Sequence, residues 1–460
     1  MPRVLLIRPL CEGDDPEFGE PLGIERLAGY LRDHGVRAEL LDRRLYAAER
    51  RAGVVTREAA GFWEDVRALC PPGSEPELVG FSLMTEGDVF DARRVMSRLG
   101  AYFPDATLVA GGVFVTTNAA RAKQLLPHRV VLSRGEGEAS LLALARGDDA
   151  VRGYVTPDEW AVPYRPYLER YARLGCAVAL QTSRGCPGTC TFCATPLLPR
   201  ELRRWRGRDV VLVADEMAHV ASRLVLAGLP PVFNVVDDDA GPLWRLEALA
   251  GELVGKDLRM AWACEMRLAA LVGQPRLADR LRELHEAGLT RLFVGVESLN
   301  PSTLRAWHKD YDTTRLPEVL AAVRTAGIAM QTGYLLWHAG QTVAGALDEV
   351  CRLRELGIYT HQAAVSRLIV FAGSELGRGR AEAAAFEPMD AREETFYHEF
   401  CSRTQDLRGR WVAAAIREPY EAARAHVSGD ASALEAVRRE LADVNEQSFR
   451  QFVRLAKCLA

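Results

Sequence analysis

The sequence lacks long apolar runs and a strong charge of either sign. No stretch approaches the ~20 apolar residues that a membrane-spanning helix requires. The segment before Val4–Ile7 is too short for the charged and apolar regions of a signal peptide. The 58 Lys and Arg residues nearly balance 62 Asp and Glu residues, for a formal net charge of -4. We therefore expect neither a membrane nor a nucleic acid as partner, and a cytoplasmic location.

Cysteine is present at ten positions, but a reducing compartment argues against a disulfide framework. Most of these cysteines are expected to be small buried side chains, whereas a regularly spaced cluster would indicate a metal site. The composition is globular, with 48% hydrophobic and 26% charged residues. Because 460 residues exceed one ordinary core, we predict two or three domains.

Residues 1–148 alternate strand-like and helix-like segments. Val4–Arg8 and Arg37–Leu41 are short strand-like runs, and Gly23–His34 has the spacing of an amphipathic helix. Strands alternating with helices predict an α/β domain with a Rossmann-like, doubly wound parallel sheet. In such sheets ligands bind outside the carboxyl ends of the strands. Three more strands are predicted, at Leu78–Leu83, Thr107–Ala110 and Val130–Leu132.

The alternation resumes after residues 149–175, which are rich in Pro, Tyr and Arg and are interpreted as a linker. Residues 176–376 contain six predicted strand–helix units, which indicate a partial (β/α)6 barrel of the TIM type with its chemistry at the strand carboxyl ends. Residues 377–460 have helical patterning without strand signals and are predicted to form a helical region. The predicted barrel strands are Ala177–Thr182, Val232–Asp238, Arg259–Cys264, Arg291–Glu297, Ile328–Leu336 and Ala363–Phe371.

Three cysteines, Cys186, Cys190 and Cys193, lie within eight residues directly after the first predicted barrel strand. Three thiolates this close can hold a [4Fe–4S] cluster, whose fourth iron then stays open to a small molecule. Phe192 can shield the cluster from water. A zinc site is the alternative, but it requires a fourth Cys or His. The nearest preceding candidate, Cys176, lies on the other side of the strand.

At these residues the chain resembles the radical SAM superfamily, whose signature Cys-x-x-x-Cys-x-aromatic-Cys occupies the loop after the first strand of a partial barrel. The resemblance implies that the open iron chelates the amino and carboxylate groups of S-adenosylmethionine (SAM). Electron transfer into the sulfonium would then release methionine and a 5′-deoxyadenosyl radical. An electron donor such as flavodoxin or ferredoxin is expected as a partner.

Three further segments are similar to SAM-contacting segments of the superfamily. The resemblance implies that Glu297 and Ser298, at the end of the fourth strand, contact the ribose and amino group. It also implies that Arg267 on the third strand meets a carboxylate and that the turn at Gly373 supports the adenine. The segments are Leu292–Ser298, Trp262–Arg267 and Phe371–Leu376.

Four segments of the N-terminal domain resemble the cobalamin-binding domain that precedes the barrel in one branch of the superfamily. The chain has no Asp-x-His-x-x-Gly segment, so a bound corrin would lack an identifiable lower ligand. Two alternatives stay open: the domain binds cobalamin, or it serves as a lid or packing platform. The segments are Glu20–Gly23, Phe81–Thr85, Ala110–Val113 and Arg134–Glu138.

Ionisable groups gather near the predicted strand ends. Carboxylates would pair with ammonium groups, and Trp337 could stack on a ring face, which suits a hydroxyl-rich, cationic substrate such as an aminosugar. The ionisable residues are Asp237, Asp238 and Asp239 after the second strand, Glu265 on the third, His338 after the fifth and His361 at the start of the sixth.

These groups favour 1,2-diol dehydration of an aminoglycoside precursor. We predict that His338 donates a proton to the leaving hydroxyl and that Asp238, Asp239 and Glu265 bind amines or act as the base. In architecture, size and acid content the chain is similar to radical SAM diol dehydratases. The alternatives are cobalamin-dependent methyl transfer to an unactivated carbon and a non-catalytic iron–sulfur carrier.

Overall fold

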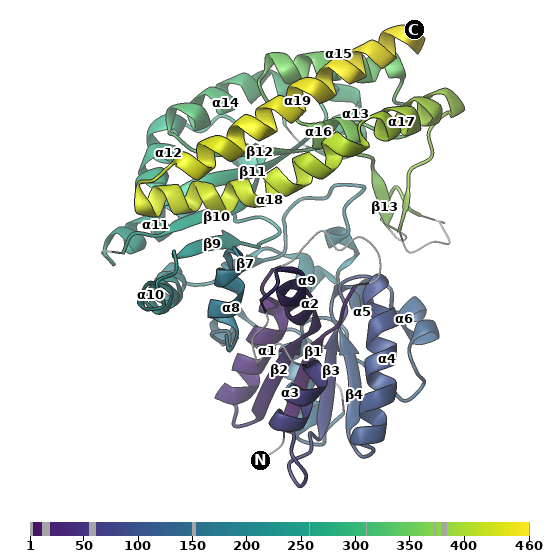
Figure 1. The fold of residues 1–460 in the computed structure, drawn as a ribbon, viewed down its shortest axis with the longest axis vertical. Coiled ribbons are helices and arrows are strands. Elements are labelled where there is room, and N and C mark those ends of the chain that lie inside the picture. Colours follow the sequence, from purple (N-terminus) through teal and green to yellow (C-terminus); the bar gives the residue numbers. More distant parts are fainter. Residues whose placement is uncertain are drawn as a thin grey trace. The chain divides into compact units, whose positions relative to one another are not determined.

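The computed structural model describes residues 3–11, 19–54, 61–149, 153–256, 258–309, 311–371, 374–378 and 384–459 (Figure 1). The chain divides into two compact units. Unit 1 comprises Met1–Leu180 and Leu197–Asp209, and unit 2 comprises Gln181–Pro196 and Val210–Ala460.

Unit 1 is built on a parallel sheet with the strand order β2-β1-β3-β4-β5. Along β1, Leu5 and Ile7 belong to one apolar layer and Val4 and Leu6 to the other, because successive side chains of a strand point to opposite faces. Both faces are therefore buried, which confirms the doubly wound sheet. The strands are β1 (Arg3–Arg8), β2 (Arg37–Asp42), β3 (Leu78–Ser82), β4 (Thr107–Gly111) and β5 (Val131–Leu132).

Helices cover both faces of this sheet. One layer contains residues of α1 and α7, and the other contains residues of α3, α4 and α5. The strand order reverses between β1 and β3, and sheets of this kind bind ligands at the carboxyl ends of strands beside such a reversal. The helices of unit 1 are α1 (Leu22–Asp33), α2 (Arg43–Arg51), α3 (Phe62–Leu69), α4 (Gly87–Tyr102), α5 (Val113–Thr117), α6 (Ala119–Leu125), α7 (Gly137–Ala145), α8 (Leu168–Arg173) and α9 (Arg200–Arg203).

Helix α8 lies in the segment 149–175, where the sequence did not predict a helix. Its buried side chains Leu168, Tyr171 and Ala172 share one face, and Arg170 pairs with Glu49 at 2.6 Å. The short strand β6 (Val178–Leu180) follows α8. Burial of one face thus stabilises this helix, although the segment is too short for its sequence to show a helical period.

Unit 2 contains a parallel set of strands in the order β12-β11-β10-β9, with helices between consecutive strands. Along β11, Leu292 and Val294 are buried, whereas Phe293 and Gly295 on the opposite face are half-buried. The residues on one face of this strand are thus more deeply buried than those on the other face. The elements are β9 (Val232–Val235), β10 (Ala261–Arg267), β11 (Leu289–Glu297), β12 (Ala329–Tyr334), α10 (Val210–Leu226), α11 (Leu243–Val254), α12 (Leu277–Glu286), α13 (Pro301–Ala306), α14 (Leu316–Thr325) and α15 (Val343–Glu355).

The predicted sixth barrel strand, Ala363–Phe371, is wrong in its first half. His361–Val365 forms helix α16, capped by the side chain of Thr360, so His361 does not open a barrel strand. Only Ile369–Phe371 forms a strand, β13, and its partner is the antiparallel strand β14 (Ala384–Phe386). The C-terminal segment therefore contains a strand that its helical patterning did not predict.

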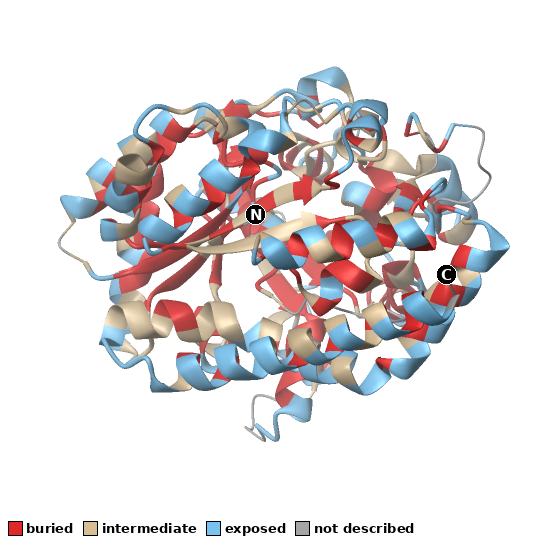
Figure 2. Ribbon diagram, turned by 90° about the horizontal axis from the view of Figure 1, so that it is seen from above, coloured by how far each residue is buried: buried red, intermediate tan, exposed pale blue. Residues whose placement is uncertain are grey.

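Three long helices complete unit 2, as predicted for its C-terminal part. They are α17 (Ala391–Arg403), α18 (Gln405–Ser428) and α19 (Ser432–Leu459). Helices α18 and α19 run side by side, and α18 packs on β9, β10 and β11 (Figure 1). Figure 2 shows exposed residues along the outer faces of the helices and buried residues in the strands beneath.

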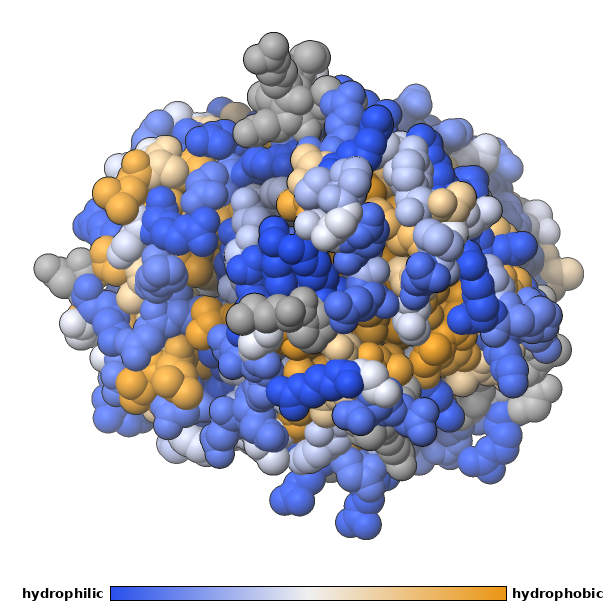
Figure 3. All heavy atoms as spheres, turned by 90° about the horizontal axis from the view of Figure 1, so that it is seen from below, coloured by the Kyte–Doolittle hydropathy of each residue, from blue (hydrophilic) through white to orange (hydrophobic). Residues whose placement is uncertain are grey.

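Within the described part of the chain, no helix combines the length and apolar character needed to cross a bilayer. Figure 3 shows one face of the molecule, on which hydrophilic side chains predominate and apolar groups lie between them.

Candidate functional site

The three cysteines lie in a loop of unit 2 that follows the short strand β7 (Ser183–Arg184). Thr191, within the loop, is held by backbone hydrogen bonds on both sides. Its N–H donates to the carbonyl oxygen of Trp307 at 3.2 Å, and its carbonyl oxygen accepts from the N–H of Leu376 at 3.1 Å. The loop is thus fixed by two segments that are distant in sequence.

The space between two of the sulfurs is kept open by a glycine. A Cβ atom added to Gly188 would lie 3.3 Å from Sγ of Cys186 and 3.7 Å from Sγ of Cys190. The Gly188 N–H donates to Sγ of Cys186 at 3.3 Å, and the Thr195 N–H donates to Sγ of Cys193 at 3.4 Å. The loop therefore offers three sulfur ligands, two of which accept a backbone hydrogen bond, and a glycine leaves space beside two of them. This arrangement fits a [4Fe–4S] cluster.

A mononuclear metal site is not preformed here. Among the described residues, no three His, Cys, Asp or Glu side chains are gathered closely enough to hold a single ion. Tetrahedral zinc needs four ligands close around one ion, whereas a four-iron cube holds its cysteines further apart. A zinc site would need a fourth ligand, which the three cysteines alone do not supply.

Burial sets the protonation state of these thiols in the metal-free chain. It raises the pKa of Cys186 to about 11 and also raises the pKa of Cys190, against which the nearby Lys309 ammonium acts. Both thiols are therefore protonated at neutral pH, and binding a cluster must release protons.

We expect the alkylation rate of Cys186 in the metal-free protein to keep rising with pH towards about 11, because only the thiolate reacts. Iodoacetamide labelling, followed by peptide mass spectrometry at several pH values, measures the rate. Cys458 is exposed and serves as the reference in the same chain, expected to react faster because its sulfur is accessible to the reagent. A Cys186 rate that levels off below pH 9 would contradict the effect of burial.

Asp237, the first of the three aspartates after β9, anchors the chain leading into the cysteine loop. Its buried carboxylate accepts hydrogen bonds from the N–H of Thr182 at 2.8 Å, from the hydroxyl of Thr182 at 2.6 Å and from the hydroxyl of Ser183 at 2.7 Å. Desolvation raises the pKa of Asp237, and these hydrogen bonds act in the opposite direction. Asp237 is thus engaged within the protein.

The other predicted acids differ in their exposure. Asp239 is buried and accepts from Nε of Arg267 at 2.7 Å, so a predicted catalytic residue pairs with a predicted cofactor-binding residue. Asp238 is exposed as a residue, but partial burial of its carboxyl raises its pKa, and it accepts from the N–H of Gly185 at 3.1 Å. Glu265 is exposed on β10, on the same strand face as Arg267. Asp238 and Glu265 are therefore more accessible to a ligand than Asp239.

Two ion pairs lie near the cysteine loop. One joins Arg267 and Asp239; desolvation lowers the pKa of the Arg267 guanidinium, but the Asp239 carboxylate raises it by more. In the other, Nζ of Lys309 lies 3.0 Å from Oε1 of Glu297 and 6.0 Å from the ring centroid of Phe192. Each pair offers a cation and an anion, a combination suited to a zwitterionic ligand. The sequence did not predict Lys309, because only the fold returns it to Glu297.

Glu297 ends β11 in a left-handed backbone conformation, with φ of 64°. The N–H of Ser298 donates to the carbonyl oxygen of Val296 at 2.8 Å, and the register with β12 shifts at this turn. The carboxylate lies over two glycines: a Cβ added to Gly295 would collide with Oε1, and one added to Gly333 would lie 3.5 Å from Oε2. Because left-handed backbone costs a non-glycine residue about 1–2 kcal/mol, the surrounding contacts must hold this conformation.

Ser298 is directed into the protein interior. Its hydroxyl donates to Glu349 at 3.2 Å and accepts from the N–H of Asn300 at 3.0 Å. The side chain is 1% exposed. Its contact with SAM stays a prediction that the resemblance carries.

Three rings form a wall beside the cysteine loop. Phe192 meets Trp307 with centroids 5.4 Å apart, and Trp307 meets His338 with centroids 5.0 Å apart, both edge to face. Nδ1 of His338 donates to the carbonyl oxygen of Ala339 at 2.8 Å, so the neutral ring presents Nε2 as an acceptor. The sequence did not predict Trp307, which is joined to the site only by the fold.

The prediction that Trp337 stacks on a substrate is wrong. Trp337 is fully buried, and its Nε1 donates to the carbonyl oxygen of Ala364 at 2.8 Å. Its ring packs against Phe396 and Phe452 of the C-terminal helices at centroid distances of 5.5 and 6.1 Å. Gly373, predicted to support the adenine, lies outside the described residues.

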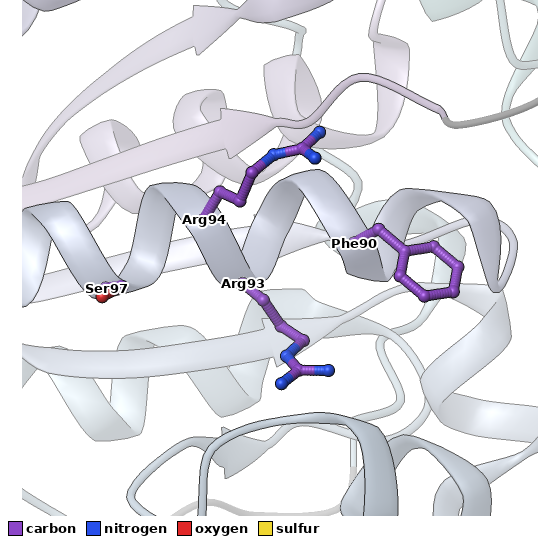
Figure 4. A pocket seen from close by; sticks show the side chains of 4 residues that line it. All are labelled: Phe90, Arg93, Arg94 and Ser97. Carbon is purple, nitrogen blue, oxygen red and sulfur yellow. The ribbon is translucent and has the colours of Figure 1, made fainter.

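A shallow surface depression also occurs on helix α4 of unit 1. It is lined by Phe90, Arg93, Arg94 and Ser97 (Figure 4). None of the residues predicted from the cysteine motif or the strand ends belongs to it.

Comparison with known protein families identifies both domains. The family model for the radical SAM superfamily matches residues 180–339, and the model for the B12-binding domain matches residues 16–145. The chain is 23% identical over 312 residues to the anaerobic magnesium-protoporphyrin IX monomethyl ester cyclase of Rubrivivax gelatinosus. This match covers 61% of the chain and 54% of the relative, so the chain spans about half the length of that protein.

Solved structures share the fold. The cobalamin-dependent SAM radical enzyme OxsB, with aqua-cobalamin and SAM bound, superimposes with a TM-score of 0.74 at 14% identity, covering 100% of this chain and 80% of OxsB. The radical SAM methyltransferase TsrM from Kitasatospora setae, with tryptophan and a SAM analogue bound, gives a TM-score of 0.63 at 20% identity. That match covers 82% of this chain and 75% of TsrM.

Proposed function

The chain carries a radical SAM domain preceded by a B12-binding domain, and from this premise we propose that it is a cobalamin-dependent enzyme that transfers a methyl group to an unactivated carbon. The observation that carries the proposal is the combination of a three-cysteine loop in unit 2 with the B12-binding match in unit 1. TsrM, a methyltransferase, shares this fold, which favours methyl transfer over the dehydration that the sequence first suggested.

The cofactors of a radical SAM domain are a [4Fe–4S] cluster and SAM, as predicted. Cys186, Cys190 and Cys193 would hold the cluster, which supplies, together with SAM, a carbon radical when both are bound. The ion pairs of Glu297 and Arg267 would orient the zwitterionic end of SAM. Phe192 would keep water from the cluster.

On the substrate side the chain offers two exposed carboxylates and one imidazole. Asp238 and Glu265 can accept hydrogen bonds from hydroxyl or ammonium groups, and Nε2 of His338 can accept one more. A hydroxyl-rich cationic molecule such as an aminosugar is therefore the proposed substrate class. Reduced flavodoxin or ferredoxin is the proposed electron donor.

Dehydration of a 1,2-diol is the second candidate reaction. It needs an acid and a base at neighbouring hydroxyls, and the exposed Asp238 and Glu265 are the observation in its favour, whereas His338, the predicted acid, is buried. The pairing of Asp239 with Arg267 leaves one fewer carboxylate for this chemistry than the sequence predicted.

We expect the anaerobically purified protein to bind hydroxocobalamin and to require it for product formation. Reduced enzyme is incubated with SAM carrying a deuterated methyl group and with an aminoglycoside precursor, and products are identified by mass spectrometry. A product that contains the deuterated methyl group supports methyl transfer. A deoxygenated product formed with deoxyadenosine and without corrin would overturn methyl transfer and support dehydration.

A further inference from the structure

The strained turn at Glu297 is held on one side by a tyrosine that belongs to no predicted motif. The hydroxyl of Tyr311 lies between the two carbonyl oxygens that flank Glu297. It donates to Val296 and is 3.3 Å from the carbonyl oxygen of Ser298. The carbonyl groups of the two residues that flank Glu297 are thereby tied to one half-buried side chain.

The residues after the turn are held on the other side by a buried carboxylate. Glu349, 5% exposed on α15, accepts hydrogen bonds from the hydroxyl of Ser298 and the N–H of Leu299, both at 3.2 Å. It also accepts from the hydroxyl of Tyr334 and, at 2.9 Å, from Nε2 of Gln341. Four donors from the strand end, β12 and the following loop thus converge on this one side chain.

We propose that Tyr311 and Glu349 are positioning residues that hold Glu297 in its left-handed conformation, with its carboxylate beside Lys309. A non-glycine residue keeps such a conformation only when its surroundings over-determine it, and the contacts above supply that constraint. Without them the backbone would relax and direct the carboxylate away from Lys309. The inference rests on the proposed role of Glu297 in binding SAM.

A double-mutant cycle tests this coupling in the full-length protein with its cluster reconstituted. The variants are Tyr311→Phe, Glu297→Gln and their combination. Two quantities are measured: the SAM dissociation constant, from the SAM-dependent change in the EPR spectrum of the reduced cluster, and the iron content. We expect Tyr311→Phe to weaken SAM binding about tenfold with unchanged iron content, as the loss of one positioning hydrogen bond implies. The combined variant should bind SAM no more weakly than Glu297→Gln alone, because both changes act through one carboxylate.

Tyr359→Phe is the matched control, because it removes another buried hydroxyl of unit 2, which lies 2.8 Å from Oγ of Ser448. It should leave SAM binding within about twofold of the original value, because the partner of this hydroxyl lies on α19 and not at the turn of Glu297. If Tyr311→Phe fails to fold, Glu349→Gln takes its place with the same expectation.

The outcomes separate the two claims. If Glu297→Gln binds SAM as tightly as the unaltered protein, the proposed role of Glu297 is wrong. The positioning role is overturned if Glu297→Gln weakens SAM binding but Tyr311→Phe does not. It is also overturned if the combined variant weakens SAM binding by the product of the factors found for the two single variants.

Discussion

Cys190→Ala should abolish the cluster and SAM cleavage together. Removing one of three cysteine ligands leaves two irons of the cube without a protein ligand, and a four-iron cluster needs a ligand on each iron. The anaerobically reconstituted variant should therefore be colourless, with iron content and deoxyadenosine formation at background. Iron and sulfide analysis and chromatographic detection of deoxyadenosine measure both losses.

Cys351→Ala is the control for this experiment. Cys351 is half-buried like Cys190, but it lies on α15, outside the loop. We expect the control to keep full iron content and SAM cleavage. A Cys190→Ala protein that retains four irons and cleaves SAM would refute the cluster assignment.

Asp237→Ala should destabilise the protein by about 2–4 kcal/mol, because it leaves a backbone N–H and two hydroxyls without their buried acceptor. The affected groups belong to Thr182 and Ser183, directly before the cysteine loop, so cluster content should fall as well. Urea denaturation of the metal-free protein, followed by circular dichroism, measures the loss in the free energy of unfolding.

Two further variants among the three consecutive aspartates show whether the buried hydrogen bonds of Asp237 cause this loss of stability. Asp237→Asn keeps one acceptor oxygen, and the neighbouring hydroxyls can rotate to accept from its amide, so it should lose less than half as much. Asp238→Ala removes a single hydrogen bond from the Gly185 N–H and should destabilise the protein by no more than about 1.5 kcal/mol. Equal losses for Asp237→Ala and Asp238→Ala would contradict the anchoring role of Asp237.

The periodicity of the chain was sufficient to predict most strands, because each lies in a parallel sheet and is short, apolar and followed by a helix. It failed at Ala363–Phe371, where a short apolar run does not distinguish helix from strand and the cap at Thr360 decides for helix. Helix α8 was missed for a related reason, since six residues are too few to show a helical period.

The cysteine spacing located the site, because ligands close in sequence need no knowledge of the fold. The other residues of the candidate site could not be predicted, because contacts between segments distant in sequence bring them together. Lys309 and Trp307 join the site through the segment after β11, and Trp337 leaves it because the C-terminal helices bury its ring. No sequence pattern distinguishes a core tryptophan from one that faces a substrate. The pairing of Asp239 with Arg267 likewise depends on the packing of β9 against β10.

Pulsed electron–nuclear double resonance on the reduced protein tests the open iron most directly. SAM labelled with ¹⁵N in the amino group and ¹⁷O in the carboxylate is added to the cluster-loaded protein. Hyperfine coupling of both labels to the cluster is the predicted result, because one iron has no side chain of its own and binds these two groups. If neither label couples and a fourth protein ligand occupies that iron, the radical SAM chemistry assigned to this chain is contradicted.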